Sequence, residues 1–434
     1  MPLIITCGHH SISKLNVMVK FNLKPLIVGV ICSLLFSSCE NKVNAQALSA
    51  QIADHAVQIQ SISPDATDFS DLTPLKKVIG DSRIVLLGEQ SHGGGSTYSA
   101  KVRLIKFLHQ EMGFEVMAFE SGMYDCAEIS RNMLAGNPME DEVLGSMFYM
   151  YATSTEVKPL FGYMDEQIKG PKPLLFCGMD SQHTGEKSQK NLVANLETFL
   201  TQNESEIQNH NNWEVFVRKV GDIIKMDRSA SKKDKAKFYE VIDLLKSELN
   251  KFKSNDTAVL SNPAFWGQIV LSLESQAKRY WGDIPDMDRD RQMASNMSWL
   301  LNNPYKDKKI IIWAHNFHIA RGLDPALPMG HFLKNEFKDE MYAIGFTGYD
   351  GEFINFVNDK KTSIVKSSKS SIEQSFKNLG WPYAMLDFGG LEESSLLKQE
   401  QKCRLFNFGE NSVVMPNIFD GLFYIETTTP TVRE

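Results

Sequence analysis

The amino-acid sequence predicts an α/β fold with a central, mainly parallel sheet flanked by helices. From about Leu72 onward, short apolar runs alternate with amphipathic stretches, which is the pattern of strands joined by helical crossovers. The 434 residues are 42% hydrophobic and 23% charged, the ordinary balance of a chain that buries a large core. Disorder and coiled coil are therefore excluded for most of the chain.

The apolar runs predict buried strands at 83–87, 114–119, 174–178 and 309–313. A helix is expected over about Thr97 to Met112, because its apolar residues recur on one face. Gly113 is a residue type that ends helices. Between 186 and 283 there is helical periodicity without a convincing strand, so a helical insertion is expected there. The runs 341–346 and 352–357 predict a hairpin, and 383–387 and 422–425 predict further short strands.

The first 47 residues are expected to be a targeting leader and linker. The apolar run 26–36 follows two lysines and is too short to span a membrane, so it is typical of a signal peptide. Cys39 follows two serines and resembles the lipid-bearing cysteine of a bacterial lipoprotein, while 45–47 (Ala-Gln-Ala) offers a site for ordinary secretion. We expect an exported protein, periplasmic or anchored to a membrane through a lipid on Cys39.

Charge and cysteine content narrow the classes of partner. A net charge of −7 lacks the positive field that a phosphate backbone requires, so nucleic acid is not an expected partner. The cysteines outside the leader are Cys126, Cys177 and Cys403. Their separations match no metal-ligand spacing and no disulfide framework. Buried free thiols are the expectation.

Ionisable side chains gather where the predicted strands end. The carboxyl ends of parallel strands lie on one edge of a sheet, where α/β folds place ligands. We therefore expect one crevice that holds Glu89 and His92 from the first strand end, Glu120 from the second, Asp180 from the third, and His315 and His318 from the fourth. Lys101 and Arg289 could add cations there, although an ion pair on a helix surface explains them equally well.

Three kinds of chemistry fit this set. Acid/base chemistry without a metal is the first interpretation. A metal site is the second, since Glu89 and His92, like His315 and His318, stand three positions apart, but no H-E-x-x-H helix accompanies them. A serine triad with Ser91 or Ser121 is the third, although neither serine stands in a G-x-S-x-G elbow. The glycines at 93–95 lack both nucleotide-binding patterns, so no cofactor is expected.

An ordered set of motifs resembles the erythromycin esterase family. The set runs from about residue 72 to the C-terminus and comprises 88–93 (Gly-Glu-Gln-Ser-His-Gly), Lys101, 113–121, 178–180, Arg289-Asp290 with Met293-Ala294, and 314–318 (Ala-His-Asn-Phe-His). The resemblance implies a metal-free hydrolase that opens the lactone ring of 14-membered macrolide antibiotics, and so a role in antibiotic resistance. It also implies one α/β domain over 72–434 with the helical portion covering the cleft.

The resemblance further implies roles for single residues. His92 is implied to be essential and to activate water, with Glu89 as the motif glutamate, Lys101 at the basic position and Glu120 as the second glutamate. His315 and His318 match the histidine pair. Our hypothesis is that His92, kept basic by Glu89 or Glu120, takes a proton from water. His315 or His318, with Lys101 if it turns inward, would then stabilise the oxyanion or protonate the leaving alkoxide.

The remaining expectations concern the substrate. Asp180 and Arg289 are assigned to substrate binding. The aromatic residues of the insertion, if they are not simply helix-packing core, would form an apolar wall for an ester or macrolide; they are Trp213, Phe216, Phe265, Trp266 and Trp281. A metal-dependent hydrolase, or an exported protein that binds a metal, haem or carbohydrate without turnover, remains the alternative function.

Overall fold

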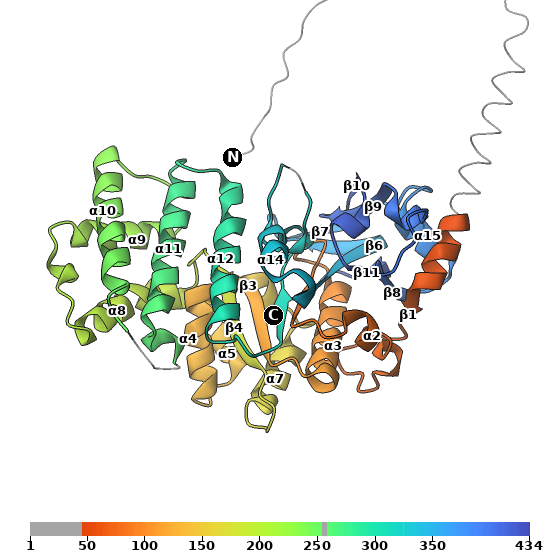
Figure 1. Ribbon diagram of the computed structural model, residues 1–434, viewed down its shortest axis with the longest axis horizontal. Helices are drawn as coiled ribbons and strands as arrows, with labels where there is room; N and C mark the ends of the chain where they lie inside the picture. Colours follow the sequence, from red (N-terminus) through yellow and green to blue (C-terminus); the bar gives the residue numbers. More distant parts are fainter. Residues whose placement is uncertain (1–45, 254–257, 324) are drawn as a thin grey trace, which may run out of the picture. The chain divides into compact units, whose positions relative to one another are not determined.

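The computed structural model describes residues 46–434, apart from 254–257 and 324 (Figure 1). The predicted signal peptide and Cys39 lie outside the described residues. None of the described helices is long and apolar enough to cross a membrane.

Nine strands of the described chain form one twisted sheet. Its order is β1-β8-β11-β6-β2-β5-β3-β4, with β7 paired to β6. All neighbours from β11 to β4 run parallel, whereas β8 and β7 are antiparallel to their partners. The mainly parallel sheet that the sequence predicted is thus confirmed. The strands are β1 (Ala56–Gln58), β2 (Ile84–Leu87), β3 (Val116–Gly122), β4 (Leu175–Asp180), β5 (Ile310–Trp313), β6 (Met341–Asn355), β7 (Lys360–Ile364), β8 (Tyr383–Asp387) and β11 (Gly421–Thr428). A separate hairpin joins β9 (Gln401–Phe406) to β10 (Gly409–Val413).

Side chains that alternate along the central strands separate two cores. In β2, for example, Ile84 and Leu86 belong to one core, and Val85 and Leu87 to the other. One core is completed mainly by α2 (Leu75–Ile79), α3 (Gly95–Met112), α5 (Met139–Val143) and α7 (Lys158–Gln167). The other is completed by α8 (Glu186–Gln202), α9 (Trp213–Ile224), α10 (Lys232–Leu249), α11 (Pro263–Tyr280), α12 (Arg289–Asn302), α14 (Met329–Phe337) and α15 (Ile372–Asn378). Both faces of the sheet are therefore buried.

Three short or peripheral helices position loops near the strand ends. They are α4 (Met123–Leu134), which packs along β4, α6 (Tyr149–Ala152) and α13 (Asn316–Ile319). The predicted helix at 97–112 is α3, which begins two residues earlier. Gly113 ends it in the left-handed conformation with φ 71°. Cys126, Cys177 and Cys403 are buried free thiols, as expected.

The predicted hairpin between 341–346 and 352–357 is wrong. Residues 341–355 form the single strand β6, and the chain reverses only after Asn355, so that 351–355 pair with 360–364 of β7. The reason is a distant partner: β11 pairs in parallel with 344–351 and keeps that stretch extended. Gly351, at φ 111°, bends the strand without reversing it, and a Cβ there would collide with the backbone of Thr428.

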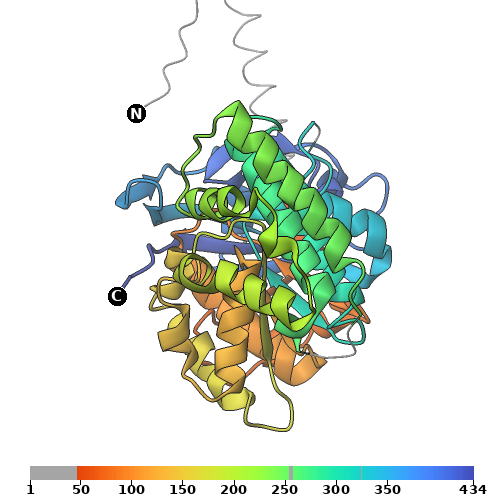
Figure 2. The ribbon, with the colours of Figure 1, turned by 90° about the vertical axis from the view of Figure 1, so that its left-hand side faces the viewer.

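The segment 186–283 contains α8 to α11, and its described residues include no strand. Figure 2 shows these helices, in green, layered in front of the strands. The five aromatic residues proposed for a substrate wall instead belong to the core between the helices. Phe216, for instance, stacks on Phe238 with ring centroids 5.5 Å apart. The apolar wall of the candidate site comes from elsewhere in the chain.

Candidate functional site

The predicted strand ends do converge. β2, β5, β3 and β4 are successive neighbours and parallel, so the residues that follow them share one edge of the sheet. A cavity of about 410 Å³ lies at this edge. Four of the predicted site residues line it: His92, Glu120, Asp180 and Arg289. The other lining residues come chiefly from the loop 145–149, the loop 182–185 and Phe356.

Glu89 is a fully buried carboxylate that receives four hydrogen bonds. Its Oε1 accepts from Nδ1 of His92 at 2.7 Å and from the hydroxyl of Tyr151 at 2.8 Å. Its Oε2 accepts from Nζ of Lys101 at 2.9 Å and from Nε1 of Trp313 at 2.8 Å. Burial alone would raise the pKa of Glu89, but the charge of Lys101 and the hydrogen bond from His92 lower it to about 2. Glu89 is therefore ionised at neutral pH.

Lys101 does not lie on a helix surface. Its side chain is fully buried on α3, and Nζ lies 4.0 Å from the ring centroid of Trp313. Burial lowers the pKa of Lys101 to about 8, while Glu89 opposes that shift. The ammonium group contacts the far side of Glu89, and Lys101 is not among the residues that line the cavity. Its effect on a reaction is exerted through Glu89.

His92 has one nitrogen committed and one available. Nδ1 is held by Glu89, so with that carboxylate ionised Nδ1 carries the proton and Nε2 the lone pair. Among the described residues, Nε2 of His92 has no hydrogen-bond partner, and the ring lines the cavity. The backbone oxygen of His92 accepts a hydrogen bond from Tyr98, which fixes the loop on α3. His92 thus presents a basic nitrogen to the cavity.

A second charged cluster alternates in sign along the cavity floor. Glu120 accepts hydrogen bonds from Nη2 of Arg289 at 3.0 Å and from the backbone N–H of His315 at 2.8 Å, and its Oε1 lies 3.1 Å from Nε2 of His318. Arg289 also binds Asp180 through two nitrogens, at 3.0 and 2.5 Å. His318 donates from Nδ1 to Asp290 at 2.7 Å. In this order Arg289, Glu120 and His318 each contact two groups of opposite charge.

The cluster fixes protonation states. Burial disfavours a charged His318, but Glu120 and Asp290 outweigh it and raise the pKa of His318 to about 10. Although burial acts in the opposite direction, the charge of His318 holds the pKa of Glu120 well below its usual range. His318 is therefore an imidazolium between two carboxylates. Arg289, whose side chain is 20% exposed, is the cation that faces the cavity.

His315 lies close to His92, with ring centroids 5.3 Å apart, but both of its ring nitrogens are used. Nε2 donates to the backbone oxygen of Gln90 at 2.9 Å, and Nδ1 accepts from the N–H of Phe317 at 3.1 Å. Burial, reinforced by the charge of His318, lowers the pKa of His315 to about 3. His315 is therefore neutral and joins the β2 loop to the start of α13.

The structure adds three residues that the sequence analysis missed. Tyr151 and Trp313 are donors to Glu89, and Asp290 is the partner of His318. Trp313 ends the predicted strand 309–313 and was counted only as a strand residue. Asp290 adjoins Arg289 in a motif already noted. Nothing in the local sequence singles out Tyr151, which comes from the short helix α6.

The alternative chemistries find less support in the geometry. Among the described residues, no group of three or more His, Cys, Asp or Glu side chains is arranged to hold a metal ion. The hydroxyl of Ser121 accepts the N–H of Phe148, and that of Ser91 is buried with no hydrogen bond to a described histidine. Neither serine has the histidine contact that a nucleophile needs.

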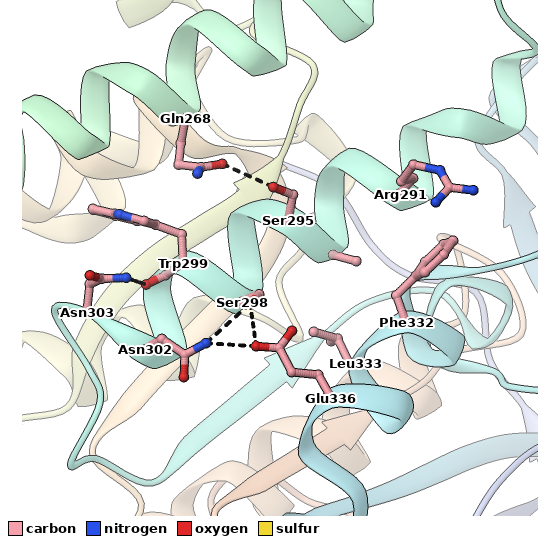
Figure 3. A pocket seen from close by; sticks show the side chains of 11 residues that line it. Gln268, Arg291, Ser295, Ser298, Trp299, Asn302, Asn303, Phe332, Leu333 and Glu336 are labelled. Atoms are coloured by element: carbon pink, nitrogen blue, oxygen red, sulfur yellow. Dashed lines mark hydrogen bonds between the residues drawn. The ribbon is translucent and has the colours of Figure 1, made fainter. Parts of the chain in front are cut away.

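A more open groove lies between α11, α12 and α14, away from these residues (Figure 3). Its polar side chains bind one another: the Oε1 of Glu336 accepts from Ser298 at 2.7 Å and from Asn302 at 2.8 Å. Its lining includes none of the predicted site residues. The cavity beside His92 is therefore the candidate active site.

The chain is similar to known proteins over most of its length. The chain is 28% identical to "Putative hydrolase YbfO" of Bacillus subtilis (strain 168), over 94% of this chain and 97% of that protein. It is 24% identical to "Erythromycin esterase type II" of Escherichia coli, over 87% and 97% of the two chains. Two solved structures share the fold. One is described as a succinoglycan biosynthesis protein (TM-score 0.72, 21% identity, 88% and 97% coverage), and the other is a mutant of the erythromycin esterase EreC in its open conformation (0.61, 16%, 86% and 98%).

The family model described as "Erythromycin esterase" matches residues 109–428. This range includes Glu120, Asp180, Arg289, His315 and His318, and it begins after Lys101. It spans well over half of the 434 residues. The chain belongs to the erythromycin esterase family.

Proposed function

We propose that this protein hydrolyses a carboxylic ester or lactone by general-base activation of water at His92. Family membership and the named hydrolase relatives support a hydrolase. The observation that carries the proposal is the Glu89–His92 pair: a buried, ionised carboxylate holds Nδ1 and leaves Nε2 facing the cavity. A general base in this position accelerates hydrolysis roughly 10²–10⁴-fold.

In the proposed reaction, Nε2 of His92 takes a proton from water while the water oxygen bonds to the ester carbonyl carbon. The carbonyl oxygen becomes an oxyanion, and Arg289 is the cation on the cavity wall that stabilises it. Collapse of the intermediate breaks the bond to the alkoxide, which receives the proton from the His92 imidazolium. Water is thereby added across the ester, giving an acid and an alcohol.

The other residues position this pair. Glu89 stabilises the imidazolium that forms at His92, and Lys101, Tyr151 and Trp313 hold Glu89. His318 stays protonated but its two N–H groups face Asp290 and Glu120, so it orients Glu120 and Arg289. We assign His315 a positioning role as well, because both of its ring nitrogens are bonded.

The finer assignments extend this proposal. The erythromycin esterase named among the relatives makes a macrolactone the first substrate to test, with macrolide inactivation and antibiotic resistance as the biological role. Asp180 positions Arg289 for substrate binding. We also propose that the predicted leader exports the enzyme, either to the periplasm or to a membrane that holds it by a lipid on Cys39.

The test is a set of incubations with simple esters and a 14-membered macrolactone, read by mass spectrometry as the gain of one water. His92→Ala is expected to lower kcat roughly 10²–10⁴-fold, while the control His331→Ala, on α14 and outside the cavity lining, keeps wild-type activity. Retention of most activity in His92→Ala would exclude His92 as the general base.

The alternative functions predict other results. Loss of activity on chelation, restored by added metal, would favour the metal-dependent hydrolase. Tight binding of a metal, haem or carbohydrate with no hydrolysed product would favour a binding protein.

A further inference from the structure

The wall of the cavity next to His92 is aromatic. The rings of Phe148 and Phe356 both meet the His92 ring edge-on, with centroids 5.0 and 4.9 Å away. The two phenylalanines also contact each other, at 6.2 Å. They come from separate parts of the chain, the loop 145–149 and the turn that follows β6. A group bonded to a carbonyl carbon near His92 would therefore lie against these rings.

Among the described residues, one hydrogen bond joins the segment of Phe148 to the turn at Phe356. The hydroxyl of Tyr149 donates to the backbone oxygen of Phe356 at 2.5 Å. Tyr149 is 41% exposed, so water competes for this bond. Arg433 lies over the Tyr149 ring, 5.4 Å from its centroid, and forms an ion pair with Asp359, which is in the same turn as Phe356. The contact therefore closes the wall through groups at the protein surface that can separate without disturbing the core.

The rest of the cavity lining includes the polar side chains Gln182, Thr184 and Arg289. On the aromatic wall, the N–H of Phe148 donates to Ser121 at the end of β3, which ties this segment to the sheet. An occupant of the cavity would therefore meet both aromatic rings and hydrogen-bonding groups.

The volume of the cavity limits the size of the substrate that it can hold. About 410 Å³ is near the lower end of the range of roughly 300–1,000 Å³ for small-molecule sites. A compact ester fits this space with the Tyr149–Phe356 bond intact. A macrolactone that carries sugars is larger, so its carbonyl reaches His92 only after that bond breaks and the turn at Phe356 moves away from Phe148.

We propose that Tyr149 and Phe356 form a gate that selects substrates by size: while their hydrogen bond is intact, the site accepts only compact esters. This inference rests on the proposed ester hydrolysis. Tyr149 is a specificity-determining residue and takes no part in proton transfer. Phe356 contributes through both its ring and its backbone oxygen.

The experiment compares kcat/KM for 4-nitrophenyl acetate with that for the bulky 4-nitrophenyl adamantane-1-carboxylate in wild type and Tyr149→Phe. The difference in intrinsic reactivity cancels when the ratio of the two values is compared between proteins. Loss of one exposed hydrogen bond is expected to raise the bulky-to-compact ratio roughly 3–10-fold, with the acetate value nearly unchanged. The matched control is Tyr239→Phe on α10, which removes a hydroxyl that donates to Asp283. This variant should leave the ratio unchanged.

Hydrogen exchange supplies a readout that does not depend on catalysis. Backbone amides in 145–149 and 354–359 should exchange faster in Tyr149→Phe than in wild type or Tyr239→Phe. An unchanged substrate ratio in an active Tyr149→Phe enzyme overturns the size gate. If no protein hydrolyses either ester, the proposed function fails, and the gate is then judged by exchange alone: faster exchange of both segments supports it, and unchanged exchange overturns it.

Discussion

Lys101 shows what one residue position in the sequence can and cannot reveal. Tyr98, Lys101, Ile105 and Leu108 follow one another at helical spacing, so the sequence does place Lys101 on the apolar face of α3. A lysine on such a face is buried only when it has a partner. That partner is Glu89, and the sequence does not show that the two meet, because the contact depends on how α3 packs against the sheet.

Removing the Lys101 charge should destabilise the protein strongly. Lys101→Met leaves Glu89 buried without its cationic partner, and breaking a buried pair by removing one side costs about 3–5 kcal/mol. Urea denaturation would measure this as a fall in the free energy of unfolding. The double variant Lys101→Met with Glu89→Gln should recover part of the loss. Equal stability of Lys101→Met and wild type would contradict the role of the pair.

For the remaining site residues, the sequence predicts their position at the strand ends but not their hydrogen-bond partners. The strand-end positions of His92, Glu120, Asp180 and His315 could be predicted, because a parallel sheet brings such ends together whatever the loops do. Their hydrogen-bond partners could not. His315 and His318 stand three positions apart and look alike in the sequence, yet one is neutral and the other is an imidazolium, because their neighbours come from different segments.

At the level of elements, local pattern identified each central strand but failed where a distant strand set the outcome. Residues 341–357 contain glycines that favour a turn by themselves. Pairing with β11, some 75 residues later, keeps the segment extended as far as Asn355. The turn consequently moves to the position from which Phe356 reaches the candidate active site.

The junction between the β2 loop and β6 should tolerate no side chain at Gly93. A Cβ at Gly93 would lie 1.8 Å from the backbone oxygen of Ile354, which is part of a strand and cannot rotate away. Gly93→Ala is therefore expected to cost roughly 2–4 kcal/mol of stability and most of the activity, as overpacking does. Gly113→Ala is the control: nothing lies within 4 Å, and only the left-handed backbone (φ 71°) is strained, so about 1 kcal/mol is expected. Thermal unfolding would measure the loss of stability in both variants. A similar loss in Gly93→Ala and Gly113→Ala would refute the steric explanation.

For the whole molecule, the buried histidines predict a maximum of stability near pH 6.5. His318 has a pKa raised from 6.5 to about 10, so its contribution is complete below pH 6.5 and is lost as the pH rises through about 10. His183 and His315 have pKa values lowered by burial to about 4 and about 3. Their contribution is present above pH 6.5 and declines as the pH falls toward those values.

Urea denaturation at pH 4, 6.5 and 10 would test this predicted maximum of stability near pH 6.5. In Asp290→Asn, the lost carboxylate lowers the pKa of His318, so the alkaline decline should begin at lower pH than in wild type. An alkaline decline that begins at the same pH in Asp290→Asn and in wild type would contradict the assignment of His318 as an imidazolium.

The strand order has a consequence for how the protein is made. β11, at Gly421–Thr428, lies between β6 and β8, and β1 pairs with β8 more than 300 residues along the chain. One half of the sheet therefore cannot assemble until the last strand has left the ribosome, and contacts of such long separation fold slowly. Until β11 is made, β6 and β8 each leave one edge without a partner strand. Premature termination just before residue 421 should therefore yield an aggregating fragment instead of a smaller folded enzyme.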